Sequence, residues 1–255
     1  MGNRSERMEL ERIVAVRNNK TIYRSGDKLI KVFDEKYSKS GILNEALNQA
    51  RVEETGLNIP ELLEVCKIDG KWAIVMDYIK GKTLDRLIQE NPDRTREYLE
   101  IFVKTQIEIH SKKARLLTIL NNKMLRKMDM AGLRDNIKYD LQTRLAGFEQ
   151  HDKVLHGDYQ LSNVIIGEDG KVYIVDWSHA TQGNASADVA MSYLLLKIEN
   201  RDDLAEEYLD LYSSSTNTDK HYIKKWIPIV AASHLKDCKK QNEKILNSFV
   251  DVMDY

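Results

Sequence analysis

The sequence is poor in cysteine and has no long apolar run, and each absence narrows what the chain can do. Its 255 residues contain two cysteines, Cys66 and Cys238, which lie far apart and fit neither a metal-binding motif nor a disulfide framework. We therefore expect a reducing, cytoplasmic environment. No apolar run approaches the ~20 residues that span a membrane. The N-terminal stretch "MGNRSERMELERIV" also lacks the apolar core of a secretory signal.

The chain also lacks an excess of charge of one sign, and this limits the kinds of partner that we expect. The chain has 39 Lys and Arg against 40 Asp and Glu, giving a net charge of −1. A nucleic-acid-binding protein usually shows a basic stripe and a high isoelectric point, so we expect no nucleic-acid partner. At 42% hydrophobic and 31% charged residues, the composition is that of a soluble globular chain. It is long enough for one large domain or two smaller lobes.

The first third of the chain predicts a small β-rich lobe. Short β-rich runs separated by polar turns indicate strands at about residues 12–17, 20–24 and 28–33, and two more flank the turn Asp69-Gly70. Between these groups, Leu43, Ala46 and Leu47 recur at helical spacing, and Gly56 follows as a stop signal. We predict a five-stranded antiparallel sheet with one helix.

The remaining two thirds predict a larger, mainly helical lobe. Helices are expected at 84–90, 95–113 and 130–148, and again from about residue 186 to the end, with a sheet-forming segment at 154–176 between them. The fold class is therefore α+β, with a boundary between residues 1–78 and 79–255. A cleft between two lobes is a favoured place for a small-molecule site.

The segment "VLHGDYQLSNVII" places His156, Asp158 and Asn163 in a polar loop between two apolar runs. The second run begins a hairpin, with strands at 164–166 and 172–175 around the turn 167–170. Asn163 precedes the first strand and Asp176 follows the second, so their backbones should lie roughly 5 Å apart at the open end. An amide oxygen with a carboxylate suits Mg²⁺ when phosphates supply further ligands. Taken singly, either residue could instead cap a turn.

The order of these residues adds specificity. The pattern H-x-D-x₄-N, then a hairpin, then Asp, is the catalytic arrangement of protein kinases, with Gly157 where protein kinases carry arginine. Their metal-binding D-F-G corresponds to Asp176-Trp177-Ser178. The combined spacing favours a phosphoryl-transfer site over a chance set of loop residues.

These motifs resemble those of the aminoglycoside phosphotransferase and choline kinase superfamily. The resemblance rests on "HGDYQLSN" and "IVDW", and it extends to "LIKVF", "VMDYIKGKTL" and "ADVAMSYLL". It implies a bilobal protein kinase-like fold, with a small β-rich N-lobe and a larger helical C-lobe. It also implies Mg²⁺-dependent transfer of the γ-phosphate of ATP or GTP to a hydroxyl of a small molecule. The expected acceptors are cations, either an aminoglycoside or an amino alcohol such as choline.

Site residues follow from the resemblance, position by position. Asp158 corresponds to the catalytic base, Asn163 and Asp176 to the magnesium ligands, and Lys31 to the lysine that contacts the α- and β-phosphates. Glu45 corresponds to the helix partner of that lysine. The hinge that meets the nucleotide base corresponds to four consecutive residues, Met76, Asp77, Tyr78 and Ile79.

One departure from protein kinases favours the small-molecule branch. No G-x-G-x-x-G occurs near residues 14–26, so the turn "RNNK", residues 17–20, would have to cover the phosphates. Two other hypotheses stay open: an atypical protein kinase-like enzyme, and a pseudokinase that binds nucleotide without catalysis. The first lacks the A-P-E segment, and the second is disfavoured by the intact Lys31, Asp158, Asn163 and Asp176.

Several polar residues have structural interpretations. We expect His156 and Asp188 to hold the catalytic loop by hydrogen bonds, and His110 to be a core histidine. Trp177 is expected to pack beside the metal, although a ring there could stack on a cationic acceptor. Without the downstream motif, Lys31 would be interpreted as a surface lysine with a buried aliphatic stem. In the C-terminal "FVDVMDY", Asp251 and Asp254 either contact a cationic acceptor or belong to a solvated tail.

Overall fold

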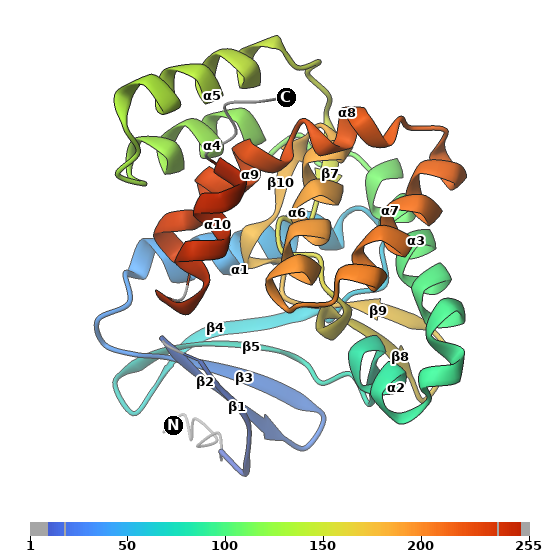
Figure 1. Ribbon diagram of the computed structural model, residues 1–255. Coiled ribbons are helices and arrows are strands. Elements are labelled where there is room, and N and C mark those ends of the chain that lie inside the picture. Colours follow the sequence, from blue (N-terminus) through green and yellow to red (C-terminus); the bar gives the residue numbers. More distant parts are fainter. Residues whose placement is uncertain (1–9, 18, 239, 251–255) are drawn as a thin grey trace, which may run out of the picture. The chain divides into compact units, whose positions relative to one another are not determined.

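The computed structural model describes residues 10–17, 19–238 and 240–250, drawn in colour in Figure 1. These residues form two compact units. The sheet unit holds the described residues up to Thr83 together with Val164–Ser178, and the helical unit holds Leu84–Asn163 and the described residues from His179 onward. The sequence placed a boundary after residue 78. In the structure, residues 79–83 and the hairpin segment also group with the N-terminal sheet.

The sheet unit contains the expected five antiparallel strands, in the order β1-β2-β3-β5-β4 (Figure 1). Their bounds are β1 Arg12–Arg17, β2 Lys20–Ser25, β3 Lys28–Phe33, β4 Leu62–Ile68 and β5 Lys71–Asp77. The turn between β4 and β5 needs left-handed backbone at Asp69 (φ 47°) and Gly70 (φ 82°), which Asp and Gly tolerate best. The sequence prediction of five strands is confirmed.

Helix α1 (Lys39–Glu53) packs on β4 and β5, and the side chain of Ser38 caps its first turn by accepting from Gly41 N at 3.1 Å. Its orientation differs from the apolar pattern. Leu43 and Leu47 are 43% and 46% exposed, whereas three polar side chains of the helix are buried. The buried polar residues are Glu45, Asn48 and Gln49. Each makes a specific hydrogen bond, which explains how polar groups tolerate burial.

A second, three-stranded sheet in the same unit has the order β6-β8-β9, formed by β6 (Gly81–Thr83), β8 (Val164–Gly167) and β9 (Val172–Ile174). The register pairs Val164 with Ile174, as the predicted hairpin requires. A side chain at Gly81 could not be accommodated, because its Cβ would lie 2.2 Å from the carbonyl oxygen of Ile166. The hairpin is joined to the rest of the unit by a hydrogen bond from Ile174 N to Asn58 O at 3.0 Å.

The helical unit is built from the remaining helices and one two-stranded ladder. The helices are α2 Leu84–Glu90, α3 Thr95–Ser111, α4 Leu120–Asp129, α5 Asp135–Gly147, α6 Ala185–Ile198, α7 Asp202–Thr216, α8 Lys220–Lys224, α9 Ile227–His234 and α10 Glu243–Val250. The ladder pairs β7 (Lys153–Leu155) with β10 (Thr181–Gly183). Helix α9 contacts α4, α6 and α10, and is central to this core (Figure 1).

One predicted helix is shorter than expected. The segment expected to be a helix at 130–148 is helical only from Asp135, and a separate helix, α4, precedes it. The chain turns between them at Gly132, whose φ is +68°. Helix α4 was not predicted, and the residue at its N-cap, Ile119, makes no side-chain cap hydrogen bond. Within the described residues, the helices are too short or too polar to cross a membrane.

Candidate active site

A buried lysine lies at the centre of the sheet unit. Lys31, on β3, is 5% exposed, and its Nζ lies 2.8 Å from Glu45 Oε1 and 3.1 Å from Asp176 Oδ1. Burial alone would lower the pKa of this ammonium, but the charges of Asp176 and Glu45 outweigh burial and raise the pKa. Lys31 is therefore a fixed cation. Of the acidic residues on α1, Glu45 is the one that contacts it, as the resemblance implied.

A second lysine joins this cluster, and sequence reasoning missed it. Lys20 Nζ lies 2.9 and 3.1 Å from the two oxygens of Glu45, and 3.9 Å from Asp176 Oδ1. Lys20 ends the turn that stands where a glycine loop would be. The sequence indicated a turn at residues 17–20. It did not show that the side chain of Lys20, the last residue of this turn, reaches the carboxylates of Glu45 and Asp176. The cluster thus contains two ammonium groups and two carboxylates.

Asp176 has a backbone that few non-glycine residues adopt. Its φ is +66°, and its side chain is 33% exposed. Such left-handed positions cluster at functional sites, where surrounding contacts hold the strain. The next residues are firmly packed: Trp177 is 1% exposed and donates from Nε1 to Ile174 O at 3.2 Å. Trp177 therefore packs inside the sheet unit, in line with the packing interpretation.

The predicted hinge continues from β5. Met76 is 4% exposed and belongs to the core between the sheet and α1. The N–H of Asp77 donates to Glu61 O at 3.0 Å, and that of Tyr78 donates to Asp27 O at 2.8 Å. These two donors are used within the protein.

In the helical unit, the loop after β7 requires a glycine. Gly157 has φ +78°, and a Cβ there would lie 2.6 Å from the carbonyl oxygen of His179. Any side chain would therefore collide with backbone, and arginine, which protein kinases carry at this position, is excluded. The backbone at Gly157 therefore follows a path that only glycine allows.

Asp188, in the first turn of α6, anchors this loop. It is 3% exposed and accepts from Gly157 N at 2.7 Å, His156 N at 3.2 Å and His110 Nε2 at 3.0 Å. Burial alone would raise the pKa of the Asp188 carboxyl, but the hydrogen bond and charge of His110, with smaller effects of His156 and Gly157, hold it below the ordinary value. The structural roles predicted for Asp188 and His110 are seen directly.

The anchor extends one residue further into the core. His110 is 4% exposed, and its Nδ1 lies 2.9 Å from the hydroxyl of Tyr212. Burial raises the pKa of Tyr212, so its hydroxyl stays protonated. A hydroxyl both donates and accepts, so it can pair with Nδ1 of either the charged or the neutral imidazole. Tyr212, His110 and Asp188 therefore form a continuous series of hydrogen bonds. Within the loop, His156 Nδ1 accepts a hydrogen bond from Asp158 N at 3.3 Å.

Asp158 and Asn163 lie at the two ends of this loop. The side chain of Asn163, 8% exposed, donates from Nδ2 to Asp158 O at 2.9 Å. This bond uses the nitrogen end of the amide, so the oxygen is the end that could act as a metal ligand. Asp158 Oδ2 accepts from Gln160 Nε2 at 3.1 Å. The amide oxygen of Asn163 and, in the sheet unit, the partly exposed carboxylate of Asp176 are each the kind of oxygen donor that Mg²⁺ prefers.

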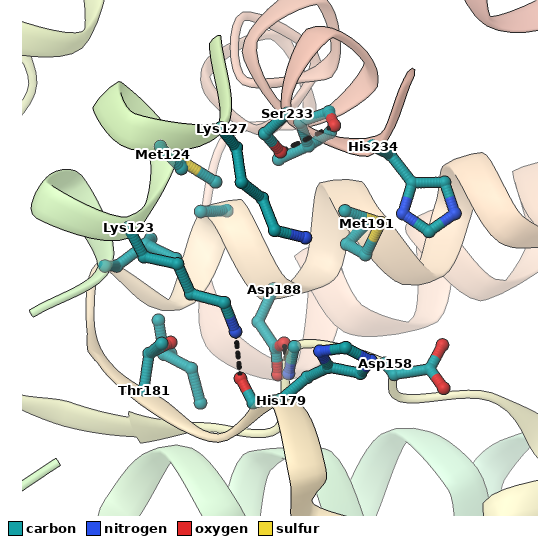
Figure 2. A pocket seen from close by; sticks show the side chains of 15 residues that line it. Lys123, Met124, Lys127, Asp158, His179, Thr181, Asp188, Met191, Ser233 and His234 are labelled. Atoms are coloured by element: carbon teal, nitrogen blue, oxygen red, sulfur yellow. Dashed lines mark hydrogen bonds between the residues drawn. The ribbon is translucent and has the colours of Figure 1, made fainter. Parts of the chain in front are cut away.

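Asp158 also lines a pocket that lies wholly within the helical unit (Figure 2). The pocket has a volume of about 150 Å³. Its wall combines apolar side chains with lysines, histidines and the carboxylates of the loop and α6. The residues are Leu120, Lys123, Met124, Lys127, Leu155, Gly157, Asp158, His179, Thr181, Ala187, Asp188, Met191, Val230, Ser233 and His234.

A comparison with protein families finds a match over residues 9–224, and the family is described as the phosphotransferase enzyme family, APH. The chain belongs to this family. A comparison with curated proteins finds no match to this chain.

Solved structures of similar fold include several phosphotransferases. A thermostable mutant of the aminoglycoside phosphotransferase APH(4)-Ia aligns with a TM-score of 0.69 at 12% identity, covering 94% of this chain and 92% of the other. Choline kinase LicA from Streptococcus pneumoniae gives 0.64 at 17% identity, covering 94% and 92%. A choline/ethanolamine kinase family protein from Mesorhizobium loti gives 0.62 at 15%, covering 95% and 88%. The predicted α+β kinase-like fold, with a β-rich N-terminal sheet and a helical C-terminal part, is confirmed.

In this member of the family, the sequence predicted the loop and the pairing of Lys31 with Glu45 but missed the pocket wall. Lys123 and Lys127 lie on α4, the helix that was not predicted, one turn apart and facing one way. The apolar Met124, which is buried on α4 between these two lysines, was the signal for this helix in the sequence. Asp251 and Asp254, considered as acceptor contacts, lie outside the described residues.

Proposed function

We propose that this chain is a Mg²⁺-dependent phosphotransferase that moves the γ-phosphate of ATP or GTP to a hydroxyl of a small molecule. The observation that carries the proposal is the position of Asp158. Its carboxylate lines a pocket large enough for a small acceptor, on a loop fixed by Asp188. Family membership supports phosphoryl transfer as the reaction class.

In the proposed reaction, Asp158 accepts the proton of the acceptor hydroxyl and orients its oxygen. That oxygen forms the new bond to the γ-phosphorus, and the bond to the bridging β–γ oxygen breaks with its electron pair leaving on the nucleoside diphosphate. Phosphoryl transfer has a loose transition state, so positioning and charge stabilisation matter more than the basicity of the carboxylate. The rigid anchoring of the loop by Asp188 fits that need.

The sheet unit would bind the nucleotide. Lys31, fixed as a cation, is proposed to contact the α- and β-phosphates, and Glu45 to orient it. Lys20, which shares Glu45, is proposed as a second cation toward the phosphates in place of a glycine loop. The hinge of Met76, Asp77, Tyr78 and Ile79 is proposed to meet the base.

Asn163 and Asp176 are proposed to hold the magnesium ion, which would offset the charge of the phosphates. Asn163 directly precedes β8, and Asp176 follows β9 by one residue, Val175. The amide of Asn163 is already oriented by its bond to Asp158 O. These are oxygen donors, and two protein ligands suffice where phosphates and waters complete the shell.

Structures of similar fold are described as complexes of nucleotide with an acceptor, among them one of APH(4)-Ia with ADP and hygromycin B. This supports a nucleotide and a small acceptor as the two substrates here. The resemblance also suggested a cationic acceptor. That finer point stays a prediction.

The test is a screen of hydroxylated acceptors with ATP or GTP and Mg²⁺, in which both the nucleoside diphosphate and the phosphorylated acceptor are measured. Replacing Asp158 by Asn keeps the side-chain size and removes the charge. We expect kcat to fall by about 10²–10⁴-fold, the range for a positioned acid or base, with little change in nucleotide affinity.

Two results would contradict the proposal. Normal transfer by the Asp158→Asn variant would reduce Asp158 to a structural residue. Tight nucleotide binding without phosphorylation of any acceptor would favour the pseudokinase, and phosphorylation of protein alone would favour a protein kinase.

A further inference from the structure

A second groove lies in the helical unit. It has a volume of about 740 Å³ and shares no lining residue with the pocket beside Asp158. Its wall comes from the C-terminal end of α3, the segment after that helix, the start of β7 and one residue of β10, Gln182. Helix α3 packs against β7 here (Figure 1). All of these elements belong to the same compact unit, so the groove is defined within it.

Lysines dominate the charge of this groove. Lys112, Lys113 and Lys153 line it, and among the described lining residues the carboxylate is that of Asp152. Asp152 Oδ2 accepts from Lys113 Nζ at 2.9 Å. Within the part of the chain that the structure describes, the side chains of Lys112 and Lys153 make no hydrogen bond or ion pair. Two ammonium groups of the wall are therefore not offset by a described carboxylate.

The backbone places two of these lysines opposite each other. Lys113 and Lys153 form an isolated antiparallel bridge, and beside it Val154 N donates to Lys112 O at 3.0 Å. Side chains directly opposite in an antiparallel pair have Cβ atoms about 4.5–5.5 Å apart, and like charges at such positions are unfavourable. An anion shared by the two ammonium groups would remove this repulsion.

A purely structural reason accounts for only part of this charge. Cations close to the C-terminus of a helix interact favourably with its dipole, which suits Lys112 and Lys113, because they directly follow α3. Lys153 begins β7, so the dipole of α3 does not explain its charge. The ion pair of Lys113 with Asp152 is exposed to solvent on both sides and is of the weak surface kind.

We propose that this groove binds phosphate or a small phosphate ester, held by Lys112, Lys113 and Lys153, at a site separate from the catalytic pocket. Three ammonium groups against one carboxylate leave an excess of two positive charges. A phosphate monoester carries about 1.5–2 negative charges near neutral pH, which matches that excess, whereas a single carboxylate matches half of it. The groove volume is within the range of small-molecule sites, about 300–1,000 Å³, so an organic part attached to the phosphate also has room.

A titration of the full chain, followed through backbone amide NMR shifts, tests the site. The probes are inorganic phosphate and glycerol phosphate, with acetate as the carboxylate arm and chloride added to hold the ionic strength constant. We expect shifts at residues 111–113 and 151–153, and phosphate binding at least about 10-fold tighter than acetate binding. The tighter of the two phosphate probes identifies free phosphate or an ester. Saturating Mg²⁺-ADP should leave these shifts in place, because the proposed nucleotide site is in the sheet unit.

Variants assign the binding to the lysines. Lys112→Met and Lys153→Met each remove one charge and keep most of the chain length. Each should raise the Kd for phosphate by about 10-fold, the effect of one charge-assisted hydrogen bond, whereas Lys153→Arg should retain most of the affinity. The matched control is Lys104→Met, which removes an exposed cation from α3 at a position outside the groove and should leave the Kd unchanged.

The outcomes bear on this site alone, because binding is measured without an acceptor. Unchanged phosphate affinity in both groove variants, or an equal loss in Lys104→Met, overturns the proposal. Phosphate-induced shifts confined to the sheet unit, or displaced by Mg²⁺-ADP, overturn it as well, and this wild-type measurement decides if a variant fails to fold. Lysine-dependent phosphate binding supports the site even if no acceptor is ever phosphorylated.

Discussion

The anchor of the catalytic loop can be tested without knowing any substrate. Asp188 is buried and holds two backbone N–H groups and the imidazole of His110. Asp188→Asn has the same shape but only one acceptor atom. If its oxygen keeps the bonds to His156 N and His110, its NH₂ group faces Gly157 N, and two donors then oppose each other.

The expected loss follows from these bonds. One charge-assisted hydrogen bond disappears, at about 1.5–3 kcal/mol, and Gly157 N–H loses its acceptor, at about 1–3 kcal/mol. The two retained bonds weaken because their acceptor is no longer charged, while local relaxation recovers part of the loss. We expect unfolding to be easier by about 3–5 kcal/mol, the range for breaking a buried charged pair. That is a large part of a typical stability of about 5–15 kcal/mol.

Two measurements check this expectation. Urea unfolding should show a midpoint lower by about 1 M or more, given a slope of about 3 kcal/mol/M. Hydrogen exchange should become faster at the amides of His156 and Gly157 in the native state. The control is Asp152→Asn, which removes a surface carboxylate beside Lys113 and should leave the midpoint unchanged. If Asp188→Asn behaves like that control, the loop is held by something other than Asp188.

The same variant has a predicted pH dependence. The pKa of Asp188 is lower in the folded chain than its ordinary value, so its contribution is present above that value, about 3.9, and is lost as the pH falls through the folded pKa. The stability difference between wild type and Asp188→Asn should therefore be constant between about pH 5 and 7 and shrink below about pH 4. A difference that grows toward acid would reverse the sign of the argument.

Two further predictions concern the nucleotide side. Asp176→Ala should abolish turnover and weaken binding of Mg²⁺-nucleotide, measured by titration, while metal-free nucleotide binds nearly as before; full activity would remove Asp176 from the metal site. Lys20→Met should raise nucleotide KM by about 10-fold, the effect of one charge-assisted hydrogen bond, whereas Lys28→Met, at an exposed position of β3, should not. Equal KM values in these two variants would exclude Lys20 from phosphate binding.

The elements that sequence predicted well are those set by local chain chemistry. The turn at Asp69-Gly70 and the hairpin around Gly167 and Gly170 specify short antiparallel strands through turn residues alone, and the structure has both. The loop from His156 to Asn163 was recognisable for the same reason, since its residues are close in sequence.

Helix α1 shows where apolar periodicity fails. The spacing of Leu43 and Leu47 predicted the helix, yet both side chains are exposed. Beside the apolar Ile42, Ala46 and Val52, the buried face carries Glu45, Asn48 and Gln49. Their bonds reach Lys31, Ser178 O and Pro60 O. A buried polar group is stable where its partner is fixed, and that partner is distant in sequence. Periodicity counts apolar residues and cannot see such bonds.

The pocket beside Asp158 was beyond sequence reasoning for a related reason. Asp158 comes from the loop after β7, the lysines from α4, and the apolar wall partly from α6 and α9, so packing in the helical unit brings the pocket together. Motifs in the loop specify what reaction is possible, because proton transfer needs one carboxylate on a fixed backbone. A resemblance carried by the loop therefore predicts phosphoryl transfer, whereas the rest of the pocket wall, which would select an acceptor, has no motif that the sequence shows.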